Sequence, residues 1–154
     1  MATYFHGVLS LCLILGAVGV GLTGVFGPSP LPPWIYGVGC MVGAVITLFS
    51  YCAKCACKEE GCRHVFPGKL AAMLPARTPG KYFLWDYAGV LLPLGFILGF
   101  PQFWLWRTPF LWAIFWILVV LALGEIILFV CKGCGNTHCP FRNAGNPVRG
   151  RPSP

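Results

Sequence analysis

Residues 110–130 have the sequence FLWAIFWILVVLALGEIILFV, and they run directly into CKGCGNTHCP at residues 131–140. The first stretch is long enough to cross a bilayer as a helix, because a span takes about 20 apolar residues. The second stretch brings a group of cysteines directly after that span, namely Cys131, Cys134 and Cys139. The same succession of an apolar run and a cysteine cluster occurs earlier in the chain, at residues 34–51 and 52–62.

The composition of the whole chain is that of an integral membrane protein. Of its 154 residues, 57% are hydrophobic and only 10% are charged, whereas soluble domains carry about 25% charged residues. Four segments are long and apolar enough to span a bilayer, at about residues 4–26, 34–51, 82–103 and 110–130. The expected fold class is therefore all-α, an up-down bundle of four membrane helices in a single domain over residues 1–154.

Two proline-containing turns separate consecutive spans on the outer side. Residues 28–33 have the sequence PSPLPP and residues 107–109 have RTP, and proline ends helices, so both predict tight loops. The first span has no basic leader and no convincing cleavage site, so it is expected to be retained rather than removed as a signal. Its small residues predict close helix packing, and they are Gly16, Ala17, Gly19, Gly21 and Gly24.

The basic residues predict the orientation. The chain carries a net charge of +7, and of its 11 Lys and Arg residues only Arg107 lies outside the loop at 52–81 and the tail at 131–154. An even number of spans between loop and tail puts both on one side, and the positive-inside rule makes that side cytoplasmic, together with both termini. A juxtamembrane basic loop explains the charge without nucleic acid. The expected partners are the lipid bilayer and other membrane subunits.

The two cysteine clusters predict a metal site. Cytoplasmic thiols are normally reduced, and clustered cysteines there more often bind metal than form disulfides. The pairs Cys52-x2-Cys55 and Cys131-x2-Cys134 each offer half of a tetrahedral all-sulfur site. The candidate ligands are Cys52, Cys55, Cys57, Cys62, His64, Cys131, Cys134 and Cys139, with His138 as a further alternative. Cys12 and Cys40 lie within spans and are expected to be plain small hydrophobic residues.

The spacing leaves the metal and the number of sites open. Zinc is the leading expectation, because closed tetrahedral sites of four thiolates, or of three thiolates and an imidazole, are its common structural use. An Fe–S cluster takes the same thiolates. Disulfides or free thiols for redox exchange, and transient copper or another soft metal, are the remaining alternatives. The candidates exceed the four ligands of one ion, so either two sites exist or several ligands are spare.

Two carboxylates fall inside or at the edge of apolar spans, and these are Asp86 and Glu125. Ionisable groups in that position are costly and face a partner, a polar cavity or a proton path. Both are therefore candidates for a proton path beside a redox centre. The alternative is a structural role, in which they bond each other's helix or Lys81.

The tail has the motif Cys131-Lys-Gly-Cys134-Gly-Asn136-Thr-His-Cys139-Pro140, of the form C-x2-C-x-N-x2-C-P. It resembles a group of small, uncharacterised prokaryotic four-span membrane proteins. In these a cytoplasmic Cys/His loop, followed by a Gly-Lys or Pro-Lys step, precedes two further spans, and Gly68-Lys69 is the counterpart here. The likeness covers about Cys52 to Pro147. It implies a prokaryotic cytoplasmic or related membrane and a shared use of both clusters, with no implied activity.

The sequence contains no Gly-rich phosphate loop, no Ser/His/Asp arrangement and no open site of histidines and carboxylates. An enzyme is therefore the less favoured class. The expected function is a small accessory or structural subunit of a larger membrane complex, with a cysteine-ligated metal joining the ends of the second and fourth spans. The alternatives are an Fe–S redox protein that exchanges electrons with a membrane quinone, and a thiol-based metal carrier.

Overall fold

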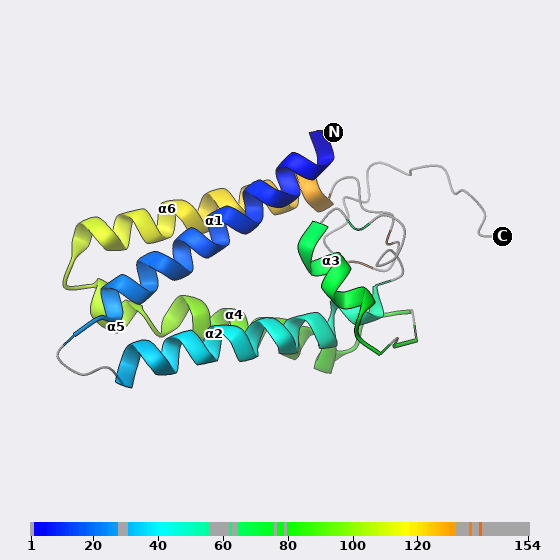
Figure 1. The fold of residues 1–154 in the computed structure, drawn as a ribbon, viewed down its shortest axis with the longest axis horizontal. Coiled ribbons are helices and arrows are strands. Elements are labelled where there is room, and N and C mark those ends of the chain that lie inside the picture. Colours follow the sequence, from blue (N-terminus) through cyan, green and yellow to red (C-terminus); the bar gives the residue numbers. More distant parts are fainter. Residues whose placement is uncertain are drawn as a thin grey trace.

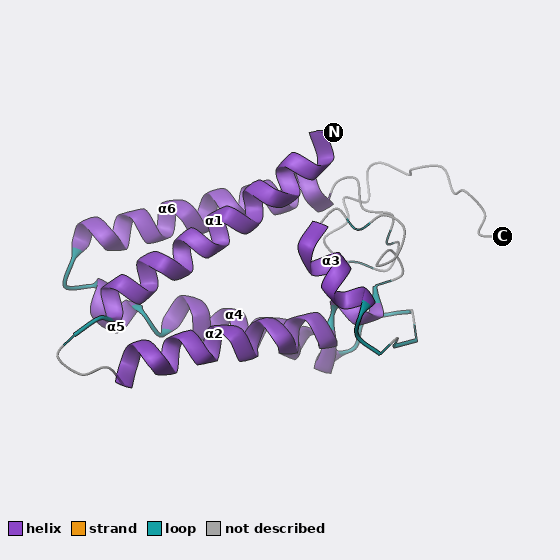
Figure 2. Cartoon of the chain, viewed as in Figure 1, coloured by secondary structure: helices purple, strands orange, loops and turns teal. Residues whose placement is uncertain are grey.

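The chain is all-helical in the part that the structure describes. The computed structural model describes residues 2–27, 31–55, 62, 65–75, 77–78, 80–131, 136 and 139. These residues form helices and connecting loops and no strand (Figure 2). Four helical segments are long and apolar enough to cross a membrane: Phe5–Val25, Leu31–Lys54, Leu84–Leu105 and Pro109–Val130. The all-α class is confirmed, and each of the four expected spans corresponds to a helical segment long and apolar enough to cross a membrane.

Several of these spans are composite. In chain order the elements are α1 (Ala2–Val25), α2 (Leu31–Ser50), the 3-10 turn η1 (Cys52–Lys54), α3 (Val65–Ala72), α4 (Leu84–Gly99), α5 (Gln102–Leu105), α6 (Pro109–Glu125) and the π-helix η2 (Ile126–Val130). The third span therefore has a break between α4 and α5, where Pro101 lies. The fourth span widens at its end into a π-helix, a conformation that is rare and often found at functional sites.

The four spans form two helix pairs. Helix α1 packs along α6, and α2 packs along α4, whereas α1 and α2 touch much less (Figure 1). Helix α1 begins and α6 ends at the end of the molecule where α2 ends and α4 begins, so the chain runs up-down-up-down as expected. Helix α3 lies at that same end and contacts α1, α2 and η1. We call this end the cysteine end, because Cys52, Cys55 and Cys131 lie there.

Two local features differ from the expectation. Helix α2 begins at Leu31, so Pro32 and Pro33 lie in its first turn and not in a loop; the missing N–H groups of proline cost nothing there. The loop expected at 52–81 contains helix α3, which has Pro67 in its first turn for the same reason. With Pro109 as the first residue of α6, proline therefore lies in the first turn of three of the described helices.

The buried core is small and lies between α1, α5 and α6. Leu105 and Phe115 are fully buried and pack with Ala17 and Val119. Trp116 packs against this cluster, and its indole Nε1 is buried with no hydrogen-bond partner among the described residues. Most other large apolar side chains of the spans are exposed. Such an apolar exterior is compatible with an integral membrane protein.

The small residues of α1 pack closely, as expected, at three of the four glycines. A Cβ at Gly21 would lie 2.7 Å from the Tyr36 hydroxyl, one at Gly24 would meet Leu105, and one at Gly16 would lie 3.6 Å from Leu118. These neighbours belong to α2, α5 and α6, so α1 contacts each of them through its glycine side. The expectation is wrong for Gly19, where a Cβ would meet nothing within 4 Å.

The α2–α4 pair is tightest where Gly89 faces Ser50. A Cβ at Gly89 would lie 2.5 Å from the Ser50 Cβ, and Thr47 Oγ1 donates to the Gly89 carbonyl at 3.3 Å. The Gly89→Ala variant is therefore expected to lose about 1–3 kcal/mol of stability, because overpacking forces the helices apart. Unfolding in detergent measures this. Gly95→Ala on the same helix, with open space around its Cβ, is the matched control, and equal losses in both variants would contradict the prediction.

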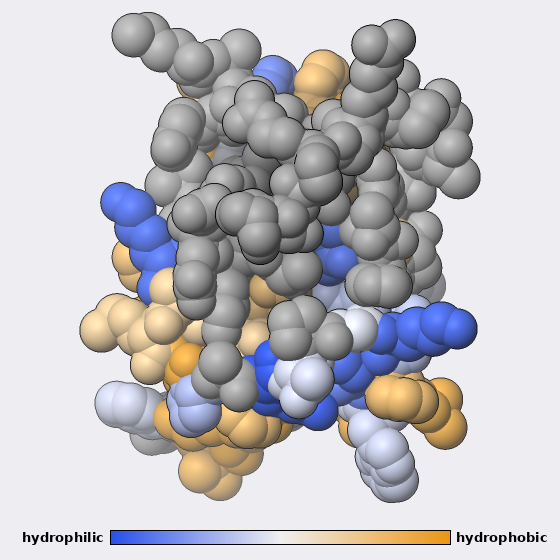
Figure 3. Space-filling model, turned by 90° about the vertical axis from the view of Figure 1, so that its right-hand side faces the viewer, coloured by the Kyte–Doolittle hydropathy of each residue, from blue (hydrophilic) through white to orange (hydrophobic). Residues whose placement is uncertain are grey.

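The described charges are unevenly distributed between the two ends. Lys54, Lys69, Arg77 and Lys81 belong to the cysteine end, whereas Arg107 lies in the turn between α5 and α6 at the opposite end. Figure 3 views the molecule from the cysteine end and shows hydrophilic side chains there, with hydrophobic side chains along the lower rim. The expected orientation in the membrane depends on this difference in positive charge between the two ends.

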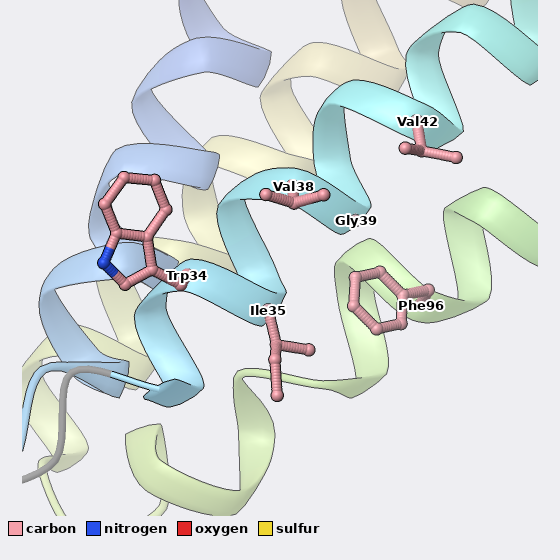
Figure 4. Close-up of a pocket in the computed structure, with 6 residues that line it drawn as sticks. All are labelled: Trp34, Ile35, Val38, Gly39, Val42 and Phe96. Carbon is pink, nitrogen blue, oxygen red and sulfur yellow. The ribbon is translucent and has the colours of Figure 1, made fainter.

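One open apolar groove runs along the face of the α2–α4 pair (Figure 4). It has a volume of about 510 Å³, and its lining is entirely apolar: Trp34, Ile35, Val38, Gly39, Val42 and Phe96. The groove lies toward the start of α2, away from the cysteine end. None of the residues that line it has a thiol, imidazole or carboxylate side chain with which to hold a metal.

Candidate metal centre

The first cysteine pair spans a single 3-10 turn. Helix α2 ends at Ser50, and η1 follows with Cys52 as its first residue. The Cys55 N–H donates to the Cys52 carbonyl at 3.0 Å, and the chain leaves the turn at Cys55 in an extended conformation. Residues three apart lie on the same side of a 3-10 turn. Local backbone geometry therefore directs both thiols to one side of the end of α2.

A third cysteine of the first cluster is held by helix α3. A Cβ at Gly68 would lie 2.7 Å from the Cys62 Sγ, so the absence of a side chain at Gly68 makes room for this thiol. Cys62 and Cys55 both lie within electrostatic range of Cys52. The described loop cysteines, Cys52, Cys55 and Cys62, therefore gather between the end of α2 and the face of α3.

The tail returns to this cluster through Asn136. Its Nδ2 donates to the Tyr82 hydroxyl at 2.9 Å and to the Cys55 Sγ at 3.4 Å. Asn136 is only 3% exposed, and it lies 81 residues from Cys55 in the sequence. A residue of the second cysteine motif thus contacts a cysteine of the first.

Cys139 makes a second contact between the tail and the end of α2. Its Sγ lies 3.2 Å from the Tyr51 hydroxyl. The Tyr51 ring stacks on the ring of Tyr82 with centroids 4.2 Å apart and an interplanar angle of 16°. Burial, followed by the nearby Cys55 thiol, raises the pKa of Tyr82 above its ordinary value, with Asn136 acting in the opposite direction. Asn136 and Cys139 therefore lie against the stacked pair of tyrosines.

Cys131 marks the end of the α1–α6 pair. Its N–H donates to the Ile126 carbonyl in the last turn of the π-helix. Burial, and secondly the neighbouring Cys139, raise the pKa of the Cys131 thiol to about 11. Cys139 thus lies near Cys131 on one helix pair and contacts Tyr51 on the other. A deprotonated thiol here needs a compensating positive charge, such as a bound metal cation.

The structure brings several predicted ligands to one end without completing a site from the described residues alone. Within the described ranges, no three or more Cys, His, Asp or Glu side chains form a group that could hold a metal ion. The described cysteines of the two clusters are Cys52, Cys55, Cys62, Cys131 and Cys139, and none is in a disulfide. Four candidates lie outside the described residues: Cys57, His64, Cys134 and His138. Cys12 and Cys40 lie in α1 and α2, within the spans.

Asp86 joins the end of α2 to the start of α4. It is 2% exposed, and its carboxylate accepts from the Lys54 ammonium at 2.7 Å and from the Arg77 guanidinium at 3.0 Å. It also accepts from the Phe83 N–H at 2.9 Å, which satisfies a free N–H at the start of α4. Asp86 therefore pairs with Lys54 and Arg77 and not with Lys81, the partner suggested from the sequence. The 3-10 turn after α2 places Lys54 over the start of α4, while Lys81 remains exposed.

Lys54 links this ion pair to the tyrosines under the tail. Its ammonium lies 5.6 Å from the ring centroid of Tyr82 and 4.6 Å from that of Phe83. Lys54 is only 7% exposed, and rings and a carboxylate together replace the water that a buried cation loses. The cysteine turn, the tyrosine pair and the ion pair therefore form one connected structure.

Glu125 pairs with His6 across the α1–α6 contact. The Glu125 Oε2 lies 2.7 Å from the His6 Nδ1, and the His6 ring stacks on Phe129 with centroids 4.4 Å apart. The partner of Glu125 therefore lies in α1 and not in α4, the helix of Asp86 that the structural alternative named. A part for Asp86 or Glu125 in a proton path stays a prediction.

Glu125→Ala is expected to lower the stability of the α1–α6 pair by about 1–3 kcal/mol, because it leaves the partly buried His6 without its partner. Glu125→Gln keeps a hydrogen-bonding side chain of the same size and is expected to lose less. Thermal unfolding in detergent compares the two variants. A larger loss in the glutamine variant than in the alanine variant would contradict this account.

Three features of this region were not expected from the sequence: helix α3, the burial of Asn136, and the stacked pair Tyr51 and Tyr82. The tyrosines carry a sequence signal, because both fall at the predicted inner boundary, where aromatic residues also occur simply as membrane anchors. The spacing Asn136-x2-Cys139 is a second signal, since asparagine favours the first position of a turn.

Comparison with known proteins identifies no relative of this chain. No protein-family model, no curated protein and no solved structure matches it. The functional argument therefore depends on the residues of the chain itself.

Proposed function

We propose that this protein is a small membrane subunit whose cytoplasmic face is held together by a cysteine-ligated zinc ion. The zinc would join the ends of the second and fourth spans. The observation that carries this proposal is the contact of the tail with the first cluster, through Asn136 on Cys55 and through Cys139 on Tyr51. Two cysteine motifs that are distant in sequence thus share one end of the bundle.

The ligand chemistry supports zinc as the leading metal. The candidate ligands remain Cys52, Cys55, Cys57, Cys62, His64, Cys131, Cys134 and Cys139. Two C-x2-C pairs supply the four thiolates of a closed tetrahedral site, and zinc favours sulfur and imidazole in that geometry. In such a site the thiolates are ionised, and the metal supplies the positive charge that a buried thiol such as Cys131 lacks.

The arrangement of the helices gives the metal a physical role. Cys52 and Cys55 follow α2, which packs with α4, whereas Cys131 follows α6, which packs with α1. A metal bound by both clusters would therefore cross-link the two helix pairs at the cysteine end, whereas the buried core joins them at the opposite end, where Leu105 of the third span packs with Ala17 and Phe115. Because the described core is small, such a cross-link stabilises the assembly more than it would a well-packed globular domain.

The orientation and the role as a subunit belong to the same proposal. The basic residues of the loop and tail support a cytoplasmic location for the cysteine end, by the positive-inside rule. The exposed apolar spans supply surface for lipid and for the helices of other membrane subunits. Native electrophoresis of mild-detergent extracts tests the subunit role. Migration in a complex with other membrane proteins is expected, and migration of the protein alone would contradict it.

Elemental analysis of purified protein tests the metal directly. Zinc at one or two ions per chain, in a colourless sample, is the expected result. Iron with visible absorption that bleaches on reduction with dithionite would replace zinc with an Fe–S cluster. Rapid exchange of the bound metal, with Cys→Ser variants that fold normally but fail to transport metal, would favour a carrier. A fully folded preparation without any metal would contradict the structural zinc site.

A further inference from the structure

Asn136 is the residue through which the tail is attached to the α2–α4 pair. Its side-chain amide donates in two directions, to Tyr82 at the start of α4 and to Cys55 at the end of η1. It is 3% exposed, so these bonds form away from competing water. A buried amide held by two elements at once has little freedom to move.

The backbone carries this attachment on to Cys139. The Cys139 N–H donates to the Asn136 carbonyl at 3.4 Å, which is the i to i+3 pattern of a turn. The Cys139 Sγ then lies 3.2 Å from the Tyr51 hydroxyl. Fixing Asn136 therefore also fixes where Cys139 lies relative to the first cysteine cluster.

The surface to which Asn136 binds is itself held in place. Tyr82 stacks on Tyr51, and Lys54 lies over the Tyr82 ring while it pairs with the buried Asp86. Tyr51 and Lys54 lie in the turn that follows α2, Tyr82 lies just before α4 and Asp86 lies in its first turn. None of these contacts requires a metal. The tail therefore has a preformed docking site on the α2–α4 pair.

We propose that Asn136 is a positioning residue that docks the tail on the tyrosine pair without metal, and so presents the two cysteine clusters together. Its effect on metal binding rests on the proposed function, whereas the docking itself does not. Mutation of a residue that orients a metal ligand through a hydrogen bond typically lowers metal affinity by about 10–100-fold. Loss of Asn136 is expected to weaken zinc binding by about tenfold or more.

Thiol alkylation of the reduced, metal-free protein in detergent tests the docking. Asn136→Ala is expected to speed modification of Cys139 and Cys55 several-fold, as followed by mass spectrometry of the peptides. Gln102→Ala is the matched control, since it also removes an amide hydrogen bond, from Gln102 to the Leu98 carbonyl at 2.8 Å, but at the opposite end. Tyr82→Phe keeps the ring stack, removes only the hydroxyl, and is expected to act in the same direction as Asn136→Ala.

A zinc titration against a chelating competitor on the same four proteins completes the test. Asn136→Ala with wild-type alkylation rates would overturn the docking, whatever happens to zinc. Faster alkylation with unchanged zinc affinity would overturn the link between docking and the metal. If the wild-type protein binds no zinc, the proposed function fails, and the alkylation rates alone then decide whether Asn136 docks the tail.

Discussion

Asp86→Asn is expected to lower the free energy of unfolding by about 3–5 kcal/mol, the loss typical of breaking a buried ion pair from one side. The Asp86 carboxylate is 2% exposed, and it neutralises Lys54, which is 7% exposed. Asparagine has nearly the same shape and still offers an oxygen to the Phe83 N–H. The expected loss of stability therefore comes from removing the negative charge of Asp86, which leaves Lys54 as a buried cation without a counter-ion.

Two further variants separate this effect from a general loss of packing. Asp86→Asn combined with Lys54→Met is expected to recover most of the stability, because removing both members of a buried pair is often nearly neutral. Arg77→Ala is expected to cost less than Asp86→Asn, since the Arg77 side chain is 37% exposed and its loss leaves Lys54 paired. Unfolding in detergent measures all three. A double variant less stable than Asp86→Asn would contradict the assignment.

Removal of the metal by a chelator is expected to lower the thermal midpoint strongly while the spans remain helical. A ligand present at 1,000 times its dissociation constant contributes about 4 kcal/mol to stability. Structural zinc sites commonly have dissociation constants low enough for zinc to contribute more than this. The spans keep their backbone hydrogen bonds within each helix, so the loss falls on the connection between the α1–α6 and α2–α4 pairs. Far-UV circular dichroism and a thermal melt, with and without chelator, measure the two effects.

Matched additions show whether the metal is the cause. Zinc restores the midpoint and magnesium does not, because thiolate sites select soft or borderline metals. Cys12→Ser, which changes a cysteine within α1, is expected to melt as the wild type does in both conditions. Metal affinity is expected to fall as the pH is lowered, since the thiols must release protons to bind. A midpoint that chelation leaves unchanged would contradict a structural metal.

The membrane spans were predictable because their signal is local. A span needs only length and apolar composition, and residues 34–51 and 110–130 carry both. Their pairing was not predictable, since the packing of α1 with α6 depends on contacts between helices and not on the pattern of either. Helix α3 was missed because it is short and follows a cysteine-rich stretch that has no apolar periodicity.

The candidate site was predictable in its residue types and less so in its connections. The C-x2-C spacing at Cys52 and Cys55 corresponds to a single 3-10 turn, a short-range relation that sequence contains. The contact between Asn136 and Tyr82 joins residues 54 apart, and no local pattern encodes it. The partner of Asp86 was missed for the same reason, because the position of Lys54 depends on how α2 ends.

The zinc content of two double variants tests most directly whether the clusters share one metal. One variant carries Cys52→Ser and Cys55→Ser in the loop, and the other carries Cys131→Ser and Cys134→Ser in the tail. Each variant is predicted to lose the zinc ion of the proposed shared site, as measured by elemental analysis after identical purification. Retention of the full zinc content by either variant would contradict a metal site that joins the ends of the second and fourth spans.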